Sequence, residues 1–265
     1  MERRTRIGDV DVSFEEHGAG NPTFVLVHGF TGARLDFEDH LEALATTRRV
    51  LAADHRGHGG STNFAAADAY SLDILATDLI AFLEAQGQGA VDLLGHSMGG
   101  MVVLRVVLAR PDLVRSLVLM DTAAESLQGV ALPDGIEAMV RRDGLLALHR
   151  KMPILPEAQR MVEQRGEDWL AANQVARLEN MDIEAFLALF PEVFGGPSLL
   201  DRLGEIACPT TVLVGSQDQP FLAPSEHLAA GIPNARLVQI EGAWHSPQRT
   251  HADLWRAKIL DHLNS

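Results

Sequence analysis

The sequence predicts an α/β protein in which a mostly parallel central sheet has helices on both faces. Two observations predict this fold. Short apolar runs of strand length alternate with longer segments of helical periodicity, as in chains that build parallel sheets. The alternation stops after Asp121 and resumes at Thr211. Because sheet elements lie on both sides of the interruption, we expect one sheet with a helical block inserted between two of its strands.

The first half of the chain is expected to supply five strands. Residues 10–14 alternate between apolar and polar side chains, which is typical of an antiparallel strand with one buried face, and Gly8-Asp9 forms the turn before it. Four further runs are mostly apolar, as in strands that are buried on both faces. These runs cover residues 23–27, 50–53, 91–94 and 117–120, and helical patterns at 72–85 and 101–109 separate the last three.

The second half of the sequence is expected to form the inserted block and the last strands of the sheet. Between residues 123 and 204 there is no convincing buried strand, and helical segments are expected at 136–151, 157–165, 169–179 and 183–190. The sheet is completed by strands at 211–214 and 237–240, with helices at 224–230 and 249–263. We therefore predict a core formed by residues 1–122 and 205–265, and a helical lid formed by residues 123–204.

Composition excludes several classes of protein. With 46% hydrophobic and 22% charged residues, the 265-residue chain is typical of globular proteins. Its net charge of −14 argues against a nucleic acid partner, which requires clustered Lys and Arg. Cys208 is the only cysteine, so no intramolecular disulfide can form. We find no apolar run typical of a signal peptide or membrane-spanning helix, which predicts a cytoplasmic location and no membrane partner.

The most informative motif is Gly95-His96-Ser97-Met98-Gly99, which lies between an apolar run and a helical pattern. A serine with glycines two residues before and after it can occupy a sharp strand-to-helix turn. The turn holds the hydroxyl out of the sheet, and the N-terminus of the following helix favours developing negative charge. Gly100 permits close packing where the helix begins. Ser97 is therefore the candidate nucleophile.

A serine hydroxyl needs an adjacent base and an orienting carboxylate. Among the eleven histidines, His245 is the candidate base, because it follows the last predicted strand and so lies at the edge of the sheet where ligands bind. Asp218, in the loop after the preceding strand, is the preferred acid. Asp121, at the end of the strand before the inserted block, competes for that role. For His96 we expect packing or a backbone hydrogen bond.

Hydrolysis of an acyl group also needs hydrogen-bond donors for the tetrahedral oxyanion. The backbone N–H of Met98, the residue after the nucleophile, is one candidate. The second is the N–H of Phe30, in the segment His28-Gly29-Phe30-Thr31-Gly32 that follows the strand at residues 23–27. Because the main chain supplies the donor, the phenyl ring is free to form a wall of the pocket.

These motifs together resemble the α/β-hydrolase fold superfamily over nearly the whole chain, with nucleophile, acid and base in that family's order. The segment at residues 54–61 resembles the family's loop beside the nucleophile turn. We interpret that loop as structural, since His55 and His58 alone make a weak metal site. The resemblance also implies that residues 123–204 cover the active site as a lid.

The resemblance leaves a serine-nucleophile, lid-bearing esterase or lactonase as the leading interpretation. Epoxide hydrolases and haloalkane dehalogenases of this fold use an aspartate where this chain has Ser97, and the only tyrosine, Tyr70, lies outside the lid. We expect cleavage of an ester or lactone of a small apolar substrate through an acyl-enzyme, without a metal or organic cofactor. The apolar character is suggested by lid residues Met139, Leu145, Leu146, Met152, Met161, Phe186, Phe190 and Phe194.

Two alternatives stay open. One is a carbon–carbon hydrolase of the meta-cleavage type, in which Ser-Met-Gly-Gly is common. Gln248 resembles that branch in the region after the candidate base, whereas Trp244, Arg249 and Thr250 differ from its pattern. The other alternative is a ligand sensor that keeps the fold with negligible turnover. The sequence does not indicate the oligomeric state.

Overall fold

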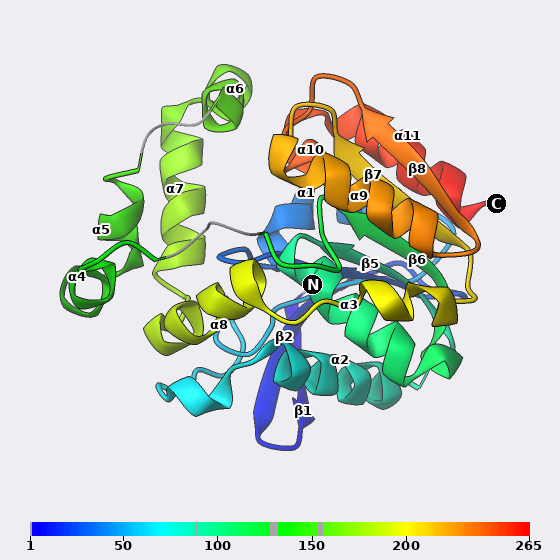
Figure 1. Ribbon diagram of the computed structural model, residues 1–265, viewed down its shortest axis with the longest axis horizontal. Coiled ribbons are helices and arrows are strands. Elements are labelled where there is room, and N and C mark those ends of the chain that lie inside the picture. The colour runs from blue at the N-terminus through cyan, green and yellow to red at the C-terminus, as the bar shows by residue number, and fades with distance from the viewer. Residues whose placement is uncertain (1, 88, 128–131, 153–155) are drawn as a thin grey trace.

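The computed structural model describes residues 2–87, 89–127, 132–152 and 156–265. Its centre is one eight-stranded sheet with the strand order β1-β2-β4-β3-β5-β6-β7-β8, shown in Figure 1. β2 pairs antiparallel with β1 and with β4, and all other neighbours are parallel. This confirms the predicted mostly parallel sheet. The strands are β1 Glu2–Ile7, β2 Val10–His17, β3 Phe24–Val27, β4 Val50–Ala53, β5 Val91–His96, β6 Val114–Met120, β7 Thr210–Gly215 and β8 Ala235–Ile240.

Helices cover both faces of the sheet, as predicted. Alternate residues of a strand point to opposite faces, and in β3 Val25 and Val27 join one apolar cluster while Phe24 and Leu26 join the other. The first cluster lies under α2, α3 and α9, and the second lies under α1 and α11. The bounds are α1 Glu38–Leu44, α2 Leu72–Gln86, α3 Met98–Ala109, α9 Gln219–Gly231 and α11 Ala252–Leu263.

The edge strand β1 was not predicted. Its sequence, ERRTRI, is mostly charged, and only Ile7 is buried. An edge strand of this kind lacks the apolar pattern that reveals strands of the interior, and its charges discourage pairing with a further chain. β1 is held instead by the ladder to β2, which runs from Glu2 opposite Glu15 to Ile7 opposite Val10.

The described residues between β6 and β7 form five α-helices and a 3-10 helix and contain no strand. In Figure 1, α4 to α7 project to one side of the sheet. No helix in the described parts of the chain is long and apolar enough to cross a bilayer. The bounds are α4 Ile136–Asp143, α5 Leu145–His149, α6 Pro156–Arg165, α7 Glu167–Leu178, α8 Ile183–Gly195 and η4 Leu200–Glu205.

Four helix boundaries differ from those expected. The segment at 136–151 is two helices, because Gly144 adopts a positive φ of 80° between α4 and α5. The terminal helix is likewise divided at His251 into α10 (Pro247–Thr250) and α11. α8 continues through Pro191, and α9 starts at Gln219 with Pro224 inside it. Proline removes one backbone donor, and here that loss did not end either helix.

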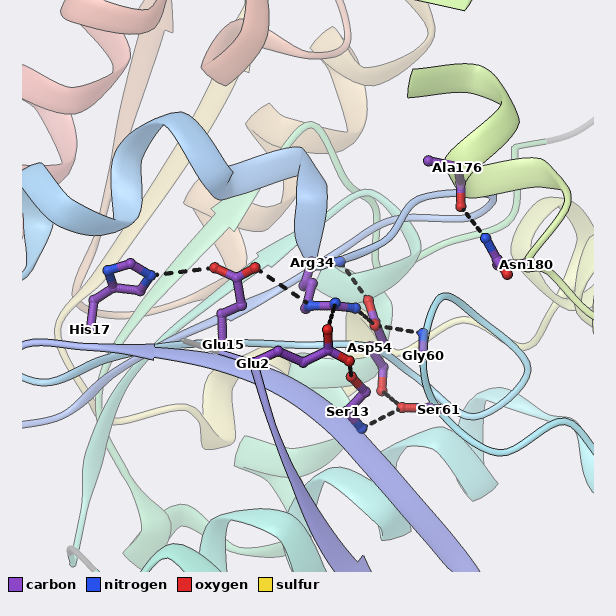
Figure 2. A network of polar contacts seen from close by, with 10 residues as sticks. All are labelled: Glu2, Ser13, Glu15, His17, Arg34, Asp54, Gly60, Ser61, Ala176 and Asn180. Atoms are coloured by element: carbon purple, nitrogen blue, oxygen red, sulfur yellow. Dashed lines mark hydrogen bonds and ion pairs between the residues drawn. The ribbon is translucent and has the colours of Figure 1, made fainter. Parts of the chain in front are cut away.

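A polar network ties the loop after β3 to the loop after β4 (Figure 2). The buried Asp54 carboxylate accepts hydrogen bonds from the backbone N–H of Arg34 at 2.7 Å and of Gly60 at 2.9 Å. The Arg34 guanidinium pairs with the same carboxylate, and Ser61 Oγ donates to the Asp54 carbonyl at 2.8 Å. The network thereby joins the two loops, which His28 of the first loop also links by accepting the His55 N–H at 3.0 Å.

Candidate active site

Ser97 occupies a sharp turn between β5 and α3. Its backbone has φ 53° and ψ −119°, a left-handed conformation that is uncommon for a residue with a side chain. The strain is balanced by hydrogen bonds on both sides of the residue. Ser97 N–H donates to the Met120 carbonyl at 2.9 Å, and Thr122 Oγ1 donates to the Ser97 carbonyl at 2.7 Å. The neighbouring strand β6 therefore holds the turn in place.

The glycines of the motif are required by close backbone contacts. A Cβ on Gly95 would lie 2.4 Å from the Gly99 carbonyl oxygen. A Cβ on Gly99 would lie 2.5 Å from the carbonyl oxygens of both Val27 and His28. On Gly100 it would meet Thr122 Oγ1 at 2.4 Å. The motif thus lets α3 approach β3 and β5 closely at the point where the chain turns.

The structure brings Ser97, His245 and Asp218 into one chain of hydrogen bonds. Ser97 Oγ donates to His245 Nε2 at 2.9 Å, and His245 Nδ1 donates to Asp218 Oδ2 at 2.7 Å. These three residues follow β5, β8 and β7, so their loops meet at the carboxyl edge of the sheet. Phe221 of α9 packs against the His245 ring with centroids 4.7 Å apart, a contact that the sequence did not predict.

Asp121, the competing acid, lies beside Asp218. One carboxylate oxygen of Asp121, one of Asp218 and one ring nitrogen of His245 all lie within 4.8 Å of one another. However, Asp121 Oδ1 accepts the Gly215 N–H at 2.8 Å, whereas Asp218 contacts the imidazole. Burial, and then the charge of Asp218, raises the pKa of Asp121 well above its usual range. Asp121 is therefore suited to stay protonated.

Both candidate oxyanion donors, the N–H groups of Met98 and Phe30, have no partner within the described parts of the chain. Met98 is the first residue of α3, where a backbone N–H has no partner within the helix. Within the described residues, neither Met98 N–H nor Phe30 N–H donates to another group of the chain. The loop of Phe30 adjoins Ser97, since a Cβ on Gly29 would lie 3.0 Å from Ser97 Cβ. Both unused donors therefore belong to segments that adjoin Ser97.

Four buried histidines support this arrangement without contacting Ser97 Oγ. His28 Nε2 accepts the His55 N–H at 3.0 Å, so its Nδ1 carries the proton and donates to the Gly29 carbonyl at 2.9 Å. The His28 ring lies 4.7 and 5.0 Å from those of His55 and His58. Burial lowers the pKa of both His55 and His58, of His58 to about 3. His96 donates from Nε2 to the His245 carbonyl at 2.7 Å, as expected of that residue.

Glu157 reaches the site from α6 in the inserted block. Its carboxylate accepts the N–H of Ser246, the residue after His245, at 2.5 Å. Burial raises the pKa of Glu157, and the nearby His245 opposes that rise only in part. No sequence signal identified Glu157, because it is one of several acidic residues on an amphipathic helix and reaches the site only through tertiary packing.

Aromatic side chains of the inserted block gather around Phe30. Phe30 stacks on Phe186 with ring centroids 5.2 Å apart, and its ring also lies 6.2 Å from Phe190 and 6.5 Å from Phe194. The three partners all come from α8. The Phe30 loop and the inserted block are therefore joined by one aromatic cluster.

The fold and this constellation define the class of the protein. The sequence model of the alpha/beta hydrolase fold family matches residues 22–252, which is most of the chain. The chain belongs to that family and is a hydrolase.

Individual relatives are named for hydrolysis of several kinds of bond. The chain is 33% identical over 262 residues to a protein of Pseudomonas savastanoi pv. phaseolicola named "Putative carbamate hydrolase RutD", covering 93% of this chain and 95% of that one. A thermophilic esterase from Thermogutta terrifontis has a similar structure, with a TM-score of 0.83, 26% identity and coverage of 100% and 98%. An enol-lactonase from Burkholderia xenovorans shares the fold, with a TM-score of 0.85, 23% identity and coverage of 99% and 100%.

Proposed function

We propose that this hydrolase uses Ser97 as a nucleophile to cleave a carboxylic ester or lactone through an acyl-enzyme intermediate. The observation that carries the proposal is the chain of hydrogen bonds from Ser97 Oγ through His245 to Asp218, at 2.9 and 2.7 Å. His245 takes the hydroxyl proton on Nε2 as the oxygen attacks the carbonyl carbon. Asp218 keeps the other imidazole nitrogen protonated and stabilises the imidazolium that forms.

The remaining steps follow from the same groups. The N–H groups of Phe30 and Met98 bind the oxyanion of the tetrahedral intermediate. As this intermediate collapses, His245 Nε2 returns the proton to the departing alkoxide, which leaves as an alcohol or, from a lactone, stays attached to the acyl chain. A water molecule then gives a proton to His245 and attacks the acyl carbonyl. Collapse of the second intermediate releases the acid and restores Ser97.

Residues 123–204 act as a lid in this proposal, and residues 1–122 and 205–265 form the catalytic core. The aromatic contacts between Phe30 and α8 support this division, because they carry part of the inserted block onto the loop that supplies an oxyanion donor. A wall of phenylalanine side chains favours an apolar acyl or alkyl group next to the bond that is cleaved.

The relative named for carbamate hydrolysis makes a carbamate a further candidate substrate, because a serine activated in this way can attack a carbamate carbonyl as well. A panel of 4-nitrophenyl esters, lactones, carbamates and vinylogous ring-fission diketones ranks the substrates by kcat/KM. Preference for the diketones would favour the carbon–carbon hydrolase. Tight binding without turnover across the panel would favour the ligand sensor.

The proposal is tested by Ser97→Ala with 4-nitrophenyl butyrate as the substrate. We expect a loss of at least about a thousandfold in kcat, since removal of a serine nucleophile leaves only residual rate enhancement. The matched control is Ser198→Ala, at an exposed position before η4, which should keep the activity of the unmodified chain. Full activity in the Ser97→Ala protein would exclude the mechanism.

A further inference from the structure

Two arginines and one aspartate form a buried ionic cluster beside the candidate active site. Arg177 lies near the end of α7, Arg249 lies in α10, and Asp36 lies in the 3-10 helix η1 (Arg34–Phe37). Asp36 Oδ1 is 3.7 Å from Arg177 Nη1 and 3.8 Å from Arg249 Nη2. The side chains of Arg177, Arg249 and Asp36 are only 19%, 6% and 4% exposed.

The cluster leaves hydrogen-bond donors without acceptors. Neither guanidinium donates a hydrogen bond to an acceptor in the described parts of the chain, and the buried Arg177 Nε and Arg249 Nη2 have no partner there. Arg56, by contrast, donates to both carboxylate oxygens of Asp78, at 2.5 and 2.8 Å. A guanidinium carries five donors, and burying them unpaired is costly. Asp36 Oδ1 also lacks a hydrogen-bond partner among the described residues, but one oxygen cannot accept from all the donors of two guanidinium groups, so a further acceptor would reduce this cost.

The charges of the cluster favour an anion as that acceptor. Although burial raises the pKa of Asp36, the charges of Arg249 and Arg177 outweigh this effect and lower it. Asp36 is the only carboxylate of the described residues within 4 Å of either guanidinium, so two positive charges share one ion-pair partner, in a chain whose net charge is −14. Glu38 acts on Arg249 only from a greater distance. The Trp169 ring faces the Arg249 guanidinium at 5.4 Å and supplies no negative charge. Glu157, whose charge also acts on Arg177, is directed to Ser246 N–H.

The cluster lies close to the groups that would carry out the reaction. Arg249 follows the base His245 by four residues, on the helix that begins next to it. Asp36 lies against the loop of the Phe30 amide, because a Cβ on Gly32 would be 2.4 Å from Asp36 Oδ2. Asp36, to which both guanidinium groups pair incompletely, thus adjoins the loop that also carries Phe30.

We propose that Arg177 and Arg249 bind a carboxylate group of the substrate, so that the preferred substrates are esters or lactones that carry a carboxylate apart from the bond that is cleaved. This inference rests on the proposed serine hydrolase function and names its substrate class. The fork of a guanidinium matches the two oxygens of a carboxylate. The apolar part of the substrate packs on the phenylalanines, and its charged end reaches the arginines.

Two esters that differ only at one end test the proposal. In mono-4-nitrophenyl succinate a carboxylate replaces the terminal methyl group of 4-nitrophenyl butyrate. We expect a higher kcat/KM for the succinate ester. Arg177→Gln and Arg249→Gln should each lower the succinate-to-butyrate ratio by about tenfold or more, mainly through KM, because each loses a charge-assisted hydrogen bond.

Arg165→Gln is the matched control, since Arg165 also lies in the inserted block and over Trp169, at 4.0 Å, but pairs with Asp39 near the surface. The Arg165→Gln protein should have the same succinate-to-butyrate ratio of kcat/KM as the unmodified chain. Should a glutamine variant fail to fold, Arg177→Lys keeps the charge and loses the fork, and it should lower the ratio by a smaller factor. Equal losses for both esters, or unchanged ratios in both arginine variants, would overturn the proposal.

These outcomes separate the inference from the function on which it rests. If Ser97→Ala abolishes butyrate hydrolysis while the arginine variants keep the ratio, the serine hydrolase remains and the carboxylate site is rejected. If Ser97→Ala retains turnover, the serine mechanism fails. Calorimetric titration of succinate into the Ser97→Ala protein, with and without Arg177→Gln, then tests the carboxylate site. Binding that requires Arg177 supports the site, and equal or absent binding in both proteins rejects it.

Discussion

The imidazole of His96, the residue before the candidate nucleophile, donates a 2.7 Å hydrogen bond from Nε2 to the backbone carbonyl of His245. A carbonyl can only accept, so the proton resides on Nε2. Burial lowers the pKa of His96 to about 3, which keeps its ring neutral at physiological pH. One neutral side chain therefore links the Ser97 turn to the loop that carries His245.

His96→Phe should lower kcat/KM for 4-nitrophenyl butyrate by about tenfold, because the loss of one buried donor costs on the order of 1–3 kcal/mol and frees the His245 loop. His96→Gln keeps an N–H donor and should retain more of the activity. The matched control is His227→Gln on α9, where the ring is exposed and pairs with Glu125. Full activity in His96→Phe would show that this hydrogen bond does not position the base.

Asp218→Asn should lower kcat by several orders of magnitude, because asparagine stabilises the wrong tautomer of His245 and cannot balance the imidazolium charge. Asp121→Asn should have a much smaller effect, since its amide oxygen can still accept the Gly215 N–H. Initial rates with an activated ester compare the two variants directly. The reverse order of losses would assign the role of the acid to Asp121.

Gly99→Ala should lower the free energy of unfolding by about 3 kcal/mol or more, because the added methyl group meets two backbone carbonyl oxygens that cannot move independently. Gly195→Ala at the end of α8 is the control: a Cβ there meets no atom within 4 Å. The control should change stability by less than about 1 kcal/mol, in the stabilising direction. Urea unfolding measures both variants, and similar stabilities would contradict the close approach of α3 to β3.

His58 should make stability depend on pH. Burial lowers its pKa from 6.5 to about 3 in the folded chain. Between these values the unfolded chain binds one more proton than the folded chain, so this contribution is complete above pH 6.5 and is lost as the pH falls toward 3. Asp121 and Glu157, with raised pKa values, act in the opposite direction. Comparing the pH dependence of the unmodified chain with that of a His58 variant therefore isolates the contribution of His58 to the unfolding free energy.

We expect the unmodified chain to lose about 1 kcal/mol more unfolding free energy than His58→Gln when the pH is lowered from 6 to 5. Urea titrations at the two pH values give the four free energies that are needed. Equal losses in the two proteins would mean that His58 is protonated to the same extent when folded and unfolded.

Much of the fold could be predicted because strands of a parallel sheet that are buried on both faces leave continuous apolar runs. The run at residues 50–53 coincides with β4, and that at 91–94 lies within β5. β1 was not predicted, because an edge strand can be polar on both faces. The division at Gly144 and the continuation through Pro191 depended on how each helix packs, which the local sequence does not reveal.

The candidate site, too, contains residues that the sequence could reveal and residues that it could not. Ser97 could be located by its flanking glycines, and His245 and Asp218 by their positions after strands. Glu157 and Arg177 could not be found, because they belong to amphipathic helices in which charged residues are usually solvent-exposed. Only the packing of α6 and α7 against α10 and η1 brings these charges to the site.

Rapid quenching during turnover of 4-nitrophenyl butyrate, followed by mass spectrometry, tests most directly whether Ser97 forms an acyl-enzyme. We predict a burst of one 4-nitrophenolate per chain and a butyryl adduct on the peptide that contains Ser97, with neither in the Ser97→Ala protein. Turnover at the full rate in that variant, or an adduct confined to another residue, would contradict a reaction at Ser97.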